Sequence, residues 1–216
     1  MPKPTRWSYS SVSTYEACPA KWKFSYVDNI PWKPSAAMVR GTRLHSMAEE
    51  YVNGTLSRVP HEVSKIGLML EDLKGKGAQA EAVWMLDSGW APTLDPAAAW
   101  VKAIVDVHYL DGDTLHVKDY KSGREYPGHA GQLELYGLIG MQVYPAVRRV
   151  EVGAVYIDAG NEGAQGSLIR AMSPKLIKIW DDKARTMMAD ETYTPTPGGA
   201  CRWCDFQKAK GGPCDY

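Results

Sequence analysis

Two runs rich in β-branched residues flank the turn sequence DGD, and this stretch constrains the fold more than any other part of the chain. The runs are AWVKAIVDVHYL and TLHVKDY. Strand-forming residues on both sides of an Asp-Gly turn are a strong hairpin signal, so we expect a β-hairpin over residues 99–120. Because side chains alternate along a strand, Asp119 and Lys121 should share one face and Tyr120 should point to the other.

The length of the hairpin loop decides which residue lies beside Asp119. A two-residue loop places Asp106 on the same face. If the loop is Gly112–Asp113, Asp106 pairs directly with Asp119. If the loop is Asp111–Gly112, Asp106 pairs with Val117, one step away. A three-residue loop with a bulge would break this parity, so the expectation of two neighbouring carboxylates depends on the turn.

Two adjacent carboxylates on a mostly apolar sheet predict a bound cation. The pair is unfavourable unless positive charge lies between its members, and Mg²⁺ takes oxygen ligands of this kind. Lys121 would project toward the same spot, where its charge can stabilise a phosphate and help to orient or deprotonate an attacking water. From spacing alone, an exposed strand with a surface ion-pair pattern explains Asp106, Asp119 and Lys121 equally well.

The segments around the hairpin predict an α/β or α+β domain with one mixed sheet. Expected helices cover residues 9–27, 39–53, 62–74, 129–144 and 173–190, and expected strands outside the hairpin cover residues 78–86 and 147–158. Candidate N-caps of the first helix are Ser10, Ser11 and Ser13, and Ser173 with Pro174 should begin the last helix. The connector KSGREYPG precedes helix 129–144.

Composition and length set only broad limits. The 216 residues favour a single domain over 1–216, with a helical part at 1–78, a sheet core at 79–160 and a C-terminal helix and tail at 161–216. Lys plus Arg and Asp plus Glu both number 25, so nucleic acid would have to be bound by local basic patches. The N-terminal residues lack the apolar run of a signal peptide, and no stretch reaches about 18 apolar residues. We therefore expect a reducing, cytoplasmic location without membrane contact.

The C-terminal sequence CRWCDFQKAKGGPC resembles a metal-binding tail but supplies only three cysteines. A closed tetrahedral site needs four ligands, and no histidine lies nearby. The remaining cysteine, Cys18, lies far away in the chain, in the first expected helix. Part of a metal site, a C-x-x-C redox pair and a disulfide are the alternatives. The redox pair is disfavoured because it lies in a tail and not at the start of a helix after a strand.

Five segments in one order resemble the PD-(D/E)XK nuclease superfamily, and specifically its RecB-type branch, which includes CRISPR-adaptation nucleases and phage exonucleases. The segments are SYSSVSTYEACPAKWKFSYV, similar to an opening helix with Cys-Pro; RGTRLHSMAEEYV, similar to a G-x-x-x-H helix; IVDV and VKDYKSG, similar to the catalytic hairpin; QLELY, similar to a Gln-x-x-x-Tyr motif; and the terminal cysteines. The resemblance implies a restriction-endonuclease-like core, with a central mixed sheet flanked by helices and with the N-terminal helices packed on the cysteine tail.

The resemblance also implies a role for each residue of the hairpin site. His45, Asp106 and Asp119 would ligate Mg²⁺ or Mn²⁺ together with the backbone carbonyl of Tyr120, and Lys121 would be the catalytic lysine. Because imidazole suits transition metals, this ligand set predicts good activity with Mn²⁺. Taken alone, a histidine on a helix is more often structural.

Further residues match the family by position. Glu81 lies where the first-motif acid is expected. Gln132 and Tyr136, four positions apart on one helix face, would hold DNA near the metal; by itself, a tyrosine packed on its neighbour explains this pair better. Arg124 and His129 are additional candidates for contacts with DNA. Other residues that could grip the substrate by charge or stacking are Arg6, Trp7, Lys21, Lys23, Arg40 and Arg43.

In the branch that this chain resembles, four cysteines tie the C-terminal tail to the first helix through a [4Fe–4S] cluster. The matching residues are Cys18, Cys201, Cys204 and Cys214. Four thiolates suit such a cluster, and they equally suit a structural Zn²⁺. The nine residues between the last two cysteines exceed the spacing in many family members.

The expected function is a metal-dependent deoxyribonuclease, most simply an exonuclease that hydrolyses single-stranded DNA or DNA ends. A non-catalytic module that binds nucleic acid or a partner, with a structural zinc or iron–sulfur site, is the alternative, and a thiol redox protein is a third hypothesis. The resemblance implies DNA, replication or recombination proteins and further copies of the chain as partners, in the cytoplasm of a bacterium or of a phage-infected host.

Overall fold

A computed structural model of the protein describes residues 3–125 and 128–216 and divides the chain into two compact units. One unit combines Met1–Pro34 with Lys178–Tyr216, and the other covers Ser35–Ile177. Residues 1–2 and 126–127 lie outside the described part of the chain. Residues 126–127 belong to the predicted connector KSGREYPG. This division does not test the expected single domain, which stays a prediction.

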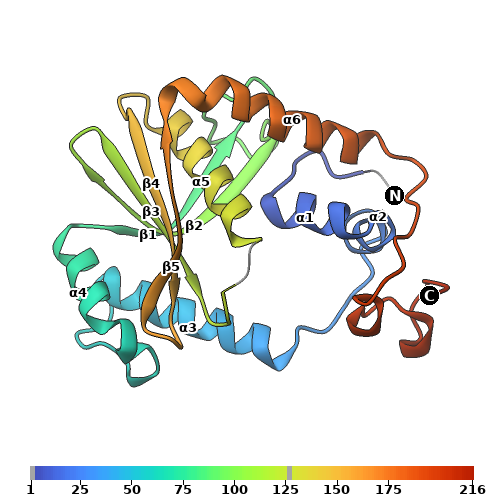
Figure 1. The fold of residues 1–216 in the computed structure, drawn as a ribbon, viewed down its shortest axis with the longest axis horizontal. Coiled ribbons are helices and arrows are strands. Elements are labelled where there is room, and N and C mark those ends of the chain that lie inside the picture. Colours follow the sequence, from blue (N-terminus) through green and yellow to red (C-terminus); the bar gives the residue numbers. More distant parts are fainter. Residues whose placement is uncertain (1–2, 126–127) are drawn as a thin grey trace. The chain divides into compact units, whose positions relative to one another are not determined.

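A five-stranded mixed sheet forms the centre of the Ser35–Ile177 unit, in the order β1-β2-β3-β4-β5 (Figure 1). The strands are β1 Gln79–Leu86, β2 Val101–Asp111, β3 Thr114–Lys121, β4 Arg149–Tyr156 and β5 Asn161–Ile169. β3 and β4 run parallel, and the other neighbouring pairs run antiparallel. The predicted fold class, a mixed sheet flanked by helices, is confirmed.

β2 and β3 form the predicted hairpin, and its loop is Gly112–Asp113. The last ladder pair on the side of the expected site is Val107↔Lys118, and continuing this register places Asp106 opposite Asp119. The first loop residue has a positive φ of 58°, which a two-residue hairpin turn favours and glycine adopts without strain. Of the two loops considered from the sequence, the structure therefore has the one that brings the two carboxylates together.

Helix α5 (His129–Val143) connects the parallel strands β3 and β4 and packs on one face of the sheet. Two glycines allow the close approach. A Cβ atom on Gly137 would lie 3.0 Å from the side chain of Val152, and one on Gly140 would lie 2.5 Å from the side chain of Leu115. The first turns of α5 consequently lie beside the end of β3, where the sequence predicts the site.

The opposite face of the sheet is covered by a second layer of helices. These are α3 Ala36–Val52, the 3₁₀ turn His61–Ile66 and α4 Gly67–Gly75. Tyr120 of β3 is buried in the apolar cluster that these helices share with the sheet. Its neighbour Asp119 instead contacts Gln132 of α5. The two side chains therefore point to opposite faces, as strand alternation predicts.

Two elements of this unit differ from the prediction. The expected helix over 62–74 begins as the 3₁₀ turn and becomes α-helical only at Gly67. Strand β5 has no predicted counterpart, because its sequence NEGAQGSLI lacks the apolar alternation of a strand. It is held by pairing along β4, and a Cβ on Gly163 would lie 2.3 Å from the ring of Tyr156. Packing against a neighbouring strand, and not local propensity, fixes this element.

The N-terminal helices differ from the single helix predicted over 9–27. The chain forms α1 Tyr9–Ala17, α2 Pro19–Trp22 and a π-helical turn Lys23–Val27. Pro19 explains the break, because a residue before proline avoids the helical conformation; Cys18 is extended, with φ −166° and ψ 110°. The N-cap is Ser8, whose hydroxyl oxygen accepts from the backbone N–H of Ser11. The predicted caps Ser10, Ser11 and Ser13 were therefore wrong.

Helix α6 (Ser173–Ala189) contains the boundary between the units. Its second half packs with the N-terminal segment, where Trp180 stacks on Trp7 with ring centroids 6.3 Å apart. Trp7 is 1% exposed, so the prediction that it contacts substrate was wrong. The predicted cap Ser173 was also wrong, because this residue is itself helical and its hydroxyl donates to the sulfur of Met141. No helix in the described residues is long and apolar enough to cross a membrane.

Candidate active site

Two carboxylates meet where the β2–β3 ladder ends. Asp106 and Asp119 are 8% and 3% exposed. One oxygen of Asp106 accepts a hydrogen bond of 2.6 Å from the backbone N–H of Tyr120, which anchors the carboxylate beside β3. Burial, reinforced by the negative charge of Asp106, raises the pKa of Asp119 to about 6 in spite of the opposing charge of Lys121. A cation bound between the two buried carboxylates would reduce their mutual repulsion.

Lys121, Gln132 and Tyr136 form a hydrogen-bonded network with Asp119. The Lys121 ammonium lies 2.5 Å from one oxygen of Asp119 and donates to the Gln132 amide oxygen at 2.8 Å. The Gln132 amide nitrogen donates to the other Asp119 oxygen at 3.0 Å and to the Tyr136 hydroxyl at 2.9 Å. Gln132 thus ties α5 to both functional groups of β3. The spacing of four predicts the shared helix face, but the sequence does not reveal that Gln132 bridges the lysine and the carboxylate.

His45 approaches the carboxylates from α3. Its Nδ1 lies 3.4 Å from an oxygen of Asp106, and its ring meets the ring of Tyr120 edge-on. Burial acts to lower the pKa of His45, but the hydrogen bond and charge of Asp106, with a smaller contribution from Asp119, raise it. The structure therefore brings His45 together with both carboxylates, although the three residues come from separate elements.

Glu81 lies in β1 at the position that the β1–β2 register places opposite Asp106. Its backbone has a positive φ of 53°, which is a strained conformation for a non-glycine residue within a strand. Burial, then the charge of Asp106, then that of Glu49, raise the pKa of Glu81. Glu49 is a residue that the sequence reasoning missed. Its position one turn after His45 on α3 is the signal that could have indicated it.

The other predicted contact residues have different surroundings. Arg124 is exposed and lines a pocket of about 570 Å³ with Tyr156 and Asp158. His129 lies 2.7 Å, through Nδ1, from the Tyr156 hydroxyl, and burial followed by the charge of Lys121 lowers its pKa. Three of the five remaining predicted basic residues form ion pairs: Arg40 with Asp158, Arg43 with Glu62 and Lys23 with Asp28. These ion pairs involve exposed or half-exposed groups, which a phosphate can reach.

The side chains at the site fit a hard divalent cation in chemical type. Carboxylate oxygens suit Mg²⁺ and Mn²⁺, and the mutual repulsion of Asp106 and Asp119 favours a positive charge between them. Within residues 3–125 and 128–216, however, no three His, Cys, Asp or Glu side chains are already arranged to hold a metal ion together. In this structure the ammonium of Lys121 neutralises Asp119 instead.

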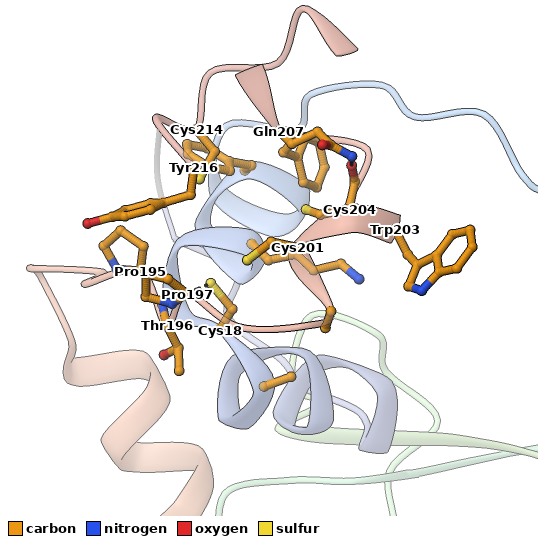
Figure 2. A pocket seen from close by; sticks show the side chains of 15 residues that line it. Cys18, Pro195, Thr196, Pro197, Cys201, Trp203, Cys204, Gln207, Cys214 and Tyr216 are labelled. Atoms are coloured by element: carbon orange, nitrogen blue, oxygen red, sulfur yellow. Dashed lines mark hydrogen bonds between the residues drawn. The ribbon is translucent and has the colours of Figure 1, made fainter. Parts of the chain in front are cut away.

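The four cysteines line one pocket of about 220 Å³ in the Met1–Pro34 and Lys178–Tyr216 unit (Figure 2). None forms a disulfide. The sulfur of Cys18 accepts from the backbone N–H of Thr196 at 3.5 Å, and the sulfur of Cys201 accepts from that of Gly198 at 3.3 Å. The disulfide alternative is therefore excluded in this structure. Cys18 thus lines the same pocket as the three tail cysteines. Among the described residues, however, no three cysteine side chains are arranged to hold a metal ion, and a shared metal centre stays a prediction.

The chain belongs to the PD-(D/E)XK nuclease superfamily, because the sequence profile of that superfamily matches residues 6–209. The mixed sheet with helices on both faces agrees with this membership. By class, then, the protein is a nuclease. The narrower RecB-type branch stays a prediction.

Individual relatives are distant. The Gene 69 protein of Mycobacterium phage D29 is 20% identical over 92% of this chain and 93% of its own length. Among solved structures, a putative exonuclease from Eubacterium rectale has a TM-score of 0.50 at 9% identity, covering 98% of this chain and 89% of that one, which shows a shared fold. The alkaline exonuclease LHK-Exo from Laribacter hongkongensis has a TM-score of 0.45 at 15% identity, covering 86% and 87%.

Proposed function

We propose that this protein is a divalent-metal-dependent DNA exonuclease. The observation that carries the proposal is the cluster of Asp106, Asp119, Lys121 and Gln132 at the end of β3, within a chain of the PD-(D/E)XK superfamily. The chemistry of these groups suits phosphodiester hydrolysis, because the reaction needs a cation, a charge next to the phosphate and an oriented water.

Each residue at the site has a separate task under this proposal. Asp106 and Asp119 would hold Mg²⁺ or Mn²⁺, with His45 and the Tyr120 carbonyl as further ligands and Glu81 as an additional acid. When bound, the cation would polarise the phosphate and lower the pKa of a water molecule. The positive charge of Lys121 then faces the negative charge that develops on the phosphate.

The α5 residues orient the substrate and the lysine. Gln132 already accepts a hydrogen bond from Lys121 and donates one to Asp119, so it holds both in place. Tyr136 lies at the other end of the same amide, and burial, followed by the charge of Asp119, raises its pKa, which keeps the hydroxyl protonated as a donor. Arg124, within the connector, and His129, at the start of α5, would contact the DNA backbone.

We also propose that the enzyme acts on DNA ends or on single-stranded DNA. The support for this is the shared fold with a protein described as a putative exonuclease. A phage relative makes a cytoplasmic role in a phage-infected host, alongside replication or recombination proteins, a reasonable setting. Assembly with further copies of the chain stays a prediction.

The direct test compares wild type with Lys121→Ala on end-labelled DNA in Mg²⁺, Mn²⁺ and EDTA. Wild type should shorten the DNA only with metal, and Lys121→Ala should lose at least about 100-fold in rate, because it removes the charge facing the phosphate. Lys118→Ala is the matched control, because Lys118 lies on the same strand and pairs with Glu162 instead. Full activity of Lys121→Ala would sink the proposal. Metal-independent DNA binding without cleavage would favour the non-catalytic module.

We further propose that Cys18, Cys201, Cys204 and Cys214 hold a [4Fe–4S] cluster. Two observations support a group bound by thiolates. The four cysteines line one pocket, and backbone N–H groups donate hydrogen bonds to two of the sulfurs. Anaerobic purification with metal analysis and a visible spectrum tests this. We expect iron and inorganic sulfide in equal amounts, lost in Cys18→Ser. One zinc per chain would instead support the structural zinc alternative.

A further inference from the structure

The tail carries one indole ring that the fold leaves in solvent. Trp203 is 73% exposed, whereas Trp7, Trp22 and Trp180 of the same unit are at most 4% exposed. It lies in the 3₁₀ turn Cys201–Trp203, directly before Cys204. Figure 2 shows its ring turned away from the four cysteine side chains. Trp203 borders the cysteine pocket, but most of its ring faces solvent and contributes nothing to the active site.

The loop that presents this ring is fixed by its own hydrogen bonds. The Gln207 amide nitrogen donates to the backbone carbonyls of Arg202 and Cys204, at 3.1 and 3.0 Å, on either side of Trp203. Phe206, three residues after Trp203, is 3% exposed, and its ring lies 5.5 Å from that of Phe24. One aromatic side chain therefore anchors the loop in its unit while the other faces outward. A loop held in this way loses little backbone freedom when its aromatic side chain binds a ligand.

One basic group contacts the ring, and further lysines belong to the same unit. The guanidinium of Arg202 lies 5.2 Å from the Trp203 ring centroid. Lys21 of α2 lines the same pocket as Trp203, and Lys208 follows Gln207 directly. Acidic groups are also present: Asp205 lies 3.8 Å from Lys210. Over Met1–Pro34 and Lys178–Tyr216 together, basic side chains exceed acidic ones by three, although the whole chain is neutral.

We propose that Trp203 and Arg202 form a stacking platform for an unpaired base of a DNA strand. This assignment rests on the proposed nuclease function and names its substrate class as single-stranded DNA. A flat, exposed indole beside a guanidinium offers a face to any base, while lysines contact phosphates. Bases within a duplex are already stacked on their neighbours, so the platform selects single strands.

The binding test uses Lys121→Ala as the background, so that the DNA is not consumed. Fluorescence anisotropy with a labelled single-stranded oligothymidylate gives the dissociation constant. Adding Trp203→Ala should weaken binding by about 5- to 150-fold, the range measured for loss of one base–aromatic stack. Trp203→Phe, which keeps a stacking ring, should restore most of the affinity. Trp32→Ala is the matched control, because Trp32 is an exposed tryptophan of the same unit, at 42%, outside the platform.

Two further ligands test whether the loss of base stacking causes the weaker binding of Trp203→Ala. An abasic oligomer of the same length keeps the phosphates but has no bases, so its affinity should be the same with and without Trp203→Ala. The corresponding duplex should be equally insensitive. Arg202→Gln should also weaken single-strand binding, because it removes the guanidinium beside the ring.

The proposal is overturned if Trp203→Ala binds oligothymidylate as tightly as its parent, or if it loses the same factor on the abasic oligomer. The latter result would assign Trp203 a structural role. Failure of the proposed nuclease function gives a different result: wild type would not hydrolyse a small nitrophenyl phosphodiester in Mg²⁺ or Mn²⁺, because that substrate needs only the metal site. Such a failure leaves the binding measurements on Trp203 interpretable.

Discussion

Replacing Asp119 by asparagine should stabilise the metal-free protein at alkaline pH while abolishing DNA hydrolysis. Burial and the neighbouring Asp106 raise the pKa of Asp119 from 3.8 to about 6. A raised carboxyl pKa means that folding favours the protonated form. The stability contributed by that proton is complete below pH 3.8 and is lost as pH rises through 6. Asparagine resembles the protonated form at every pH.

The size of the effect follows from the same pKa. A change from 3.8 to about 6 corresponds to about 3 kcal/mol when the group is fully ionised, and to about half of that at pH 5. Because Asp119 is 3% exposed, solvent screening reduces this only slightly. Since the urea dependence of the unfolding free energy for a chain of this size is about 3 kcal/mol per molar, the midpoint should rise by about 1 M at pH 8 and about half as much at pH 5.

The assay is urea denaturation of metal-free wild type and Asp119→Asn at pH 5 and pH 8, with unfolding monitored by circular dichroism. Asp111→Asn is the control, since Asp111 is exposed at the turn of the same hairpin. Addition of Mg²⁺ at pH 8 should then raise the wild-type midpoint, because a cation that binds only the folded state stabilises it, and should leave Asp119→Asn unchanged. A variant that is less stable than wild type at pH 8, or a difference that does not depend on pH, would refute the reasoning.

Three further substitutions test other parts of the structure. Burial lowers the pKa of His108 to about 4, so wild type should lose about 3 kcal/mol as pH falls from 6.5 to 4, and His108→Gln should lose less in acid denaturation. Gly140→Ala should destabilise the fold by about 1–3 kcal/mol in urea melts, because its Cβ meets Leu115 at 2.5 Å; Gly198→Ala, with open space around it, should not. Gln132→Ala should slow DNA hydrolysis by about 10- to 100-fold in steady-state assays, because it releases the lysine and the carboxylate that it bridges.

The sequence was most informative where local chemistry decides the structure. The turn DGD and the β-branched runs beside it predicted β2 and β3. They predicted the proximity of Asp106 to Asp119 only for a two-residue loop, which the structure has. The helix after the hairpin was also predicted within a residue of its observed bounds, His129–Val143. Strand alternation and helix periodicity predicted which side chains share a face, while the roles of His45, Gln132 and Tyr136 came from the family resemblance.

Features that depend on tertiary contacts could not be predicted. β5 exists because β4 offers a partner, and its glycines make room for a ring of another strand. The positive φ of Glu81 and the bridging role of Gln132 likewise arise from neighbours distant in the sequence. The break at Pro19 is different, since the rule for residues before proline was available from the sequence and should have ended the helix at Ala17.

The central claim is that Asp106 and Asp119 bind the catalytic cation. An anomalous difference map at the manganese edge, from crystals soaked in the Mn²⁺ concentration that supports DNA cleavage, tests it most directly. The account predicts a peak about 2–2.5 Å from an oxygen of each carboxylate, absent in crystals of Asp119→Asn. A map with no peak between these two residues, or with Mn²⁺ bound only elsewhere in the chain, would contradict it.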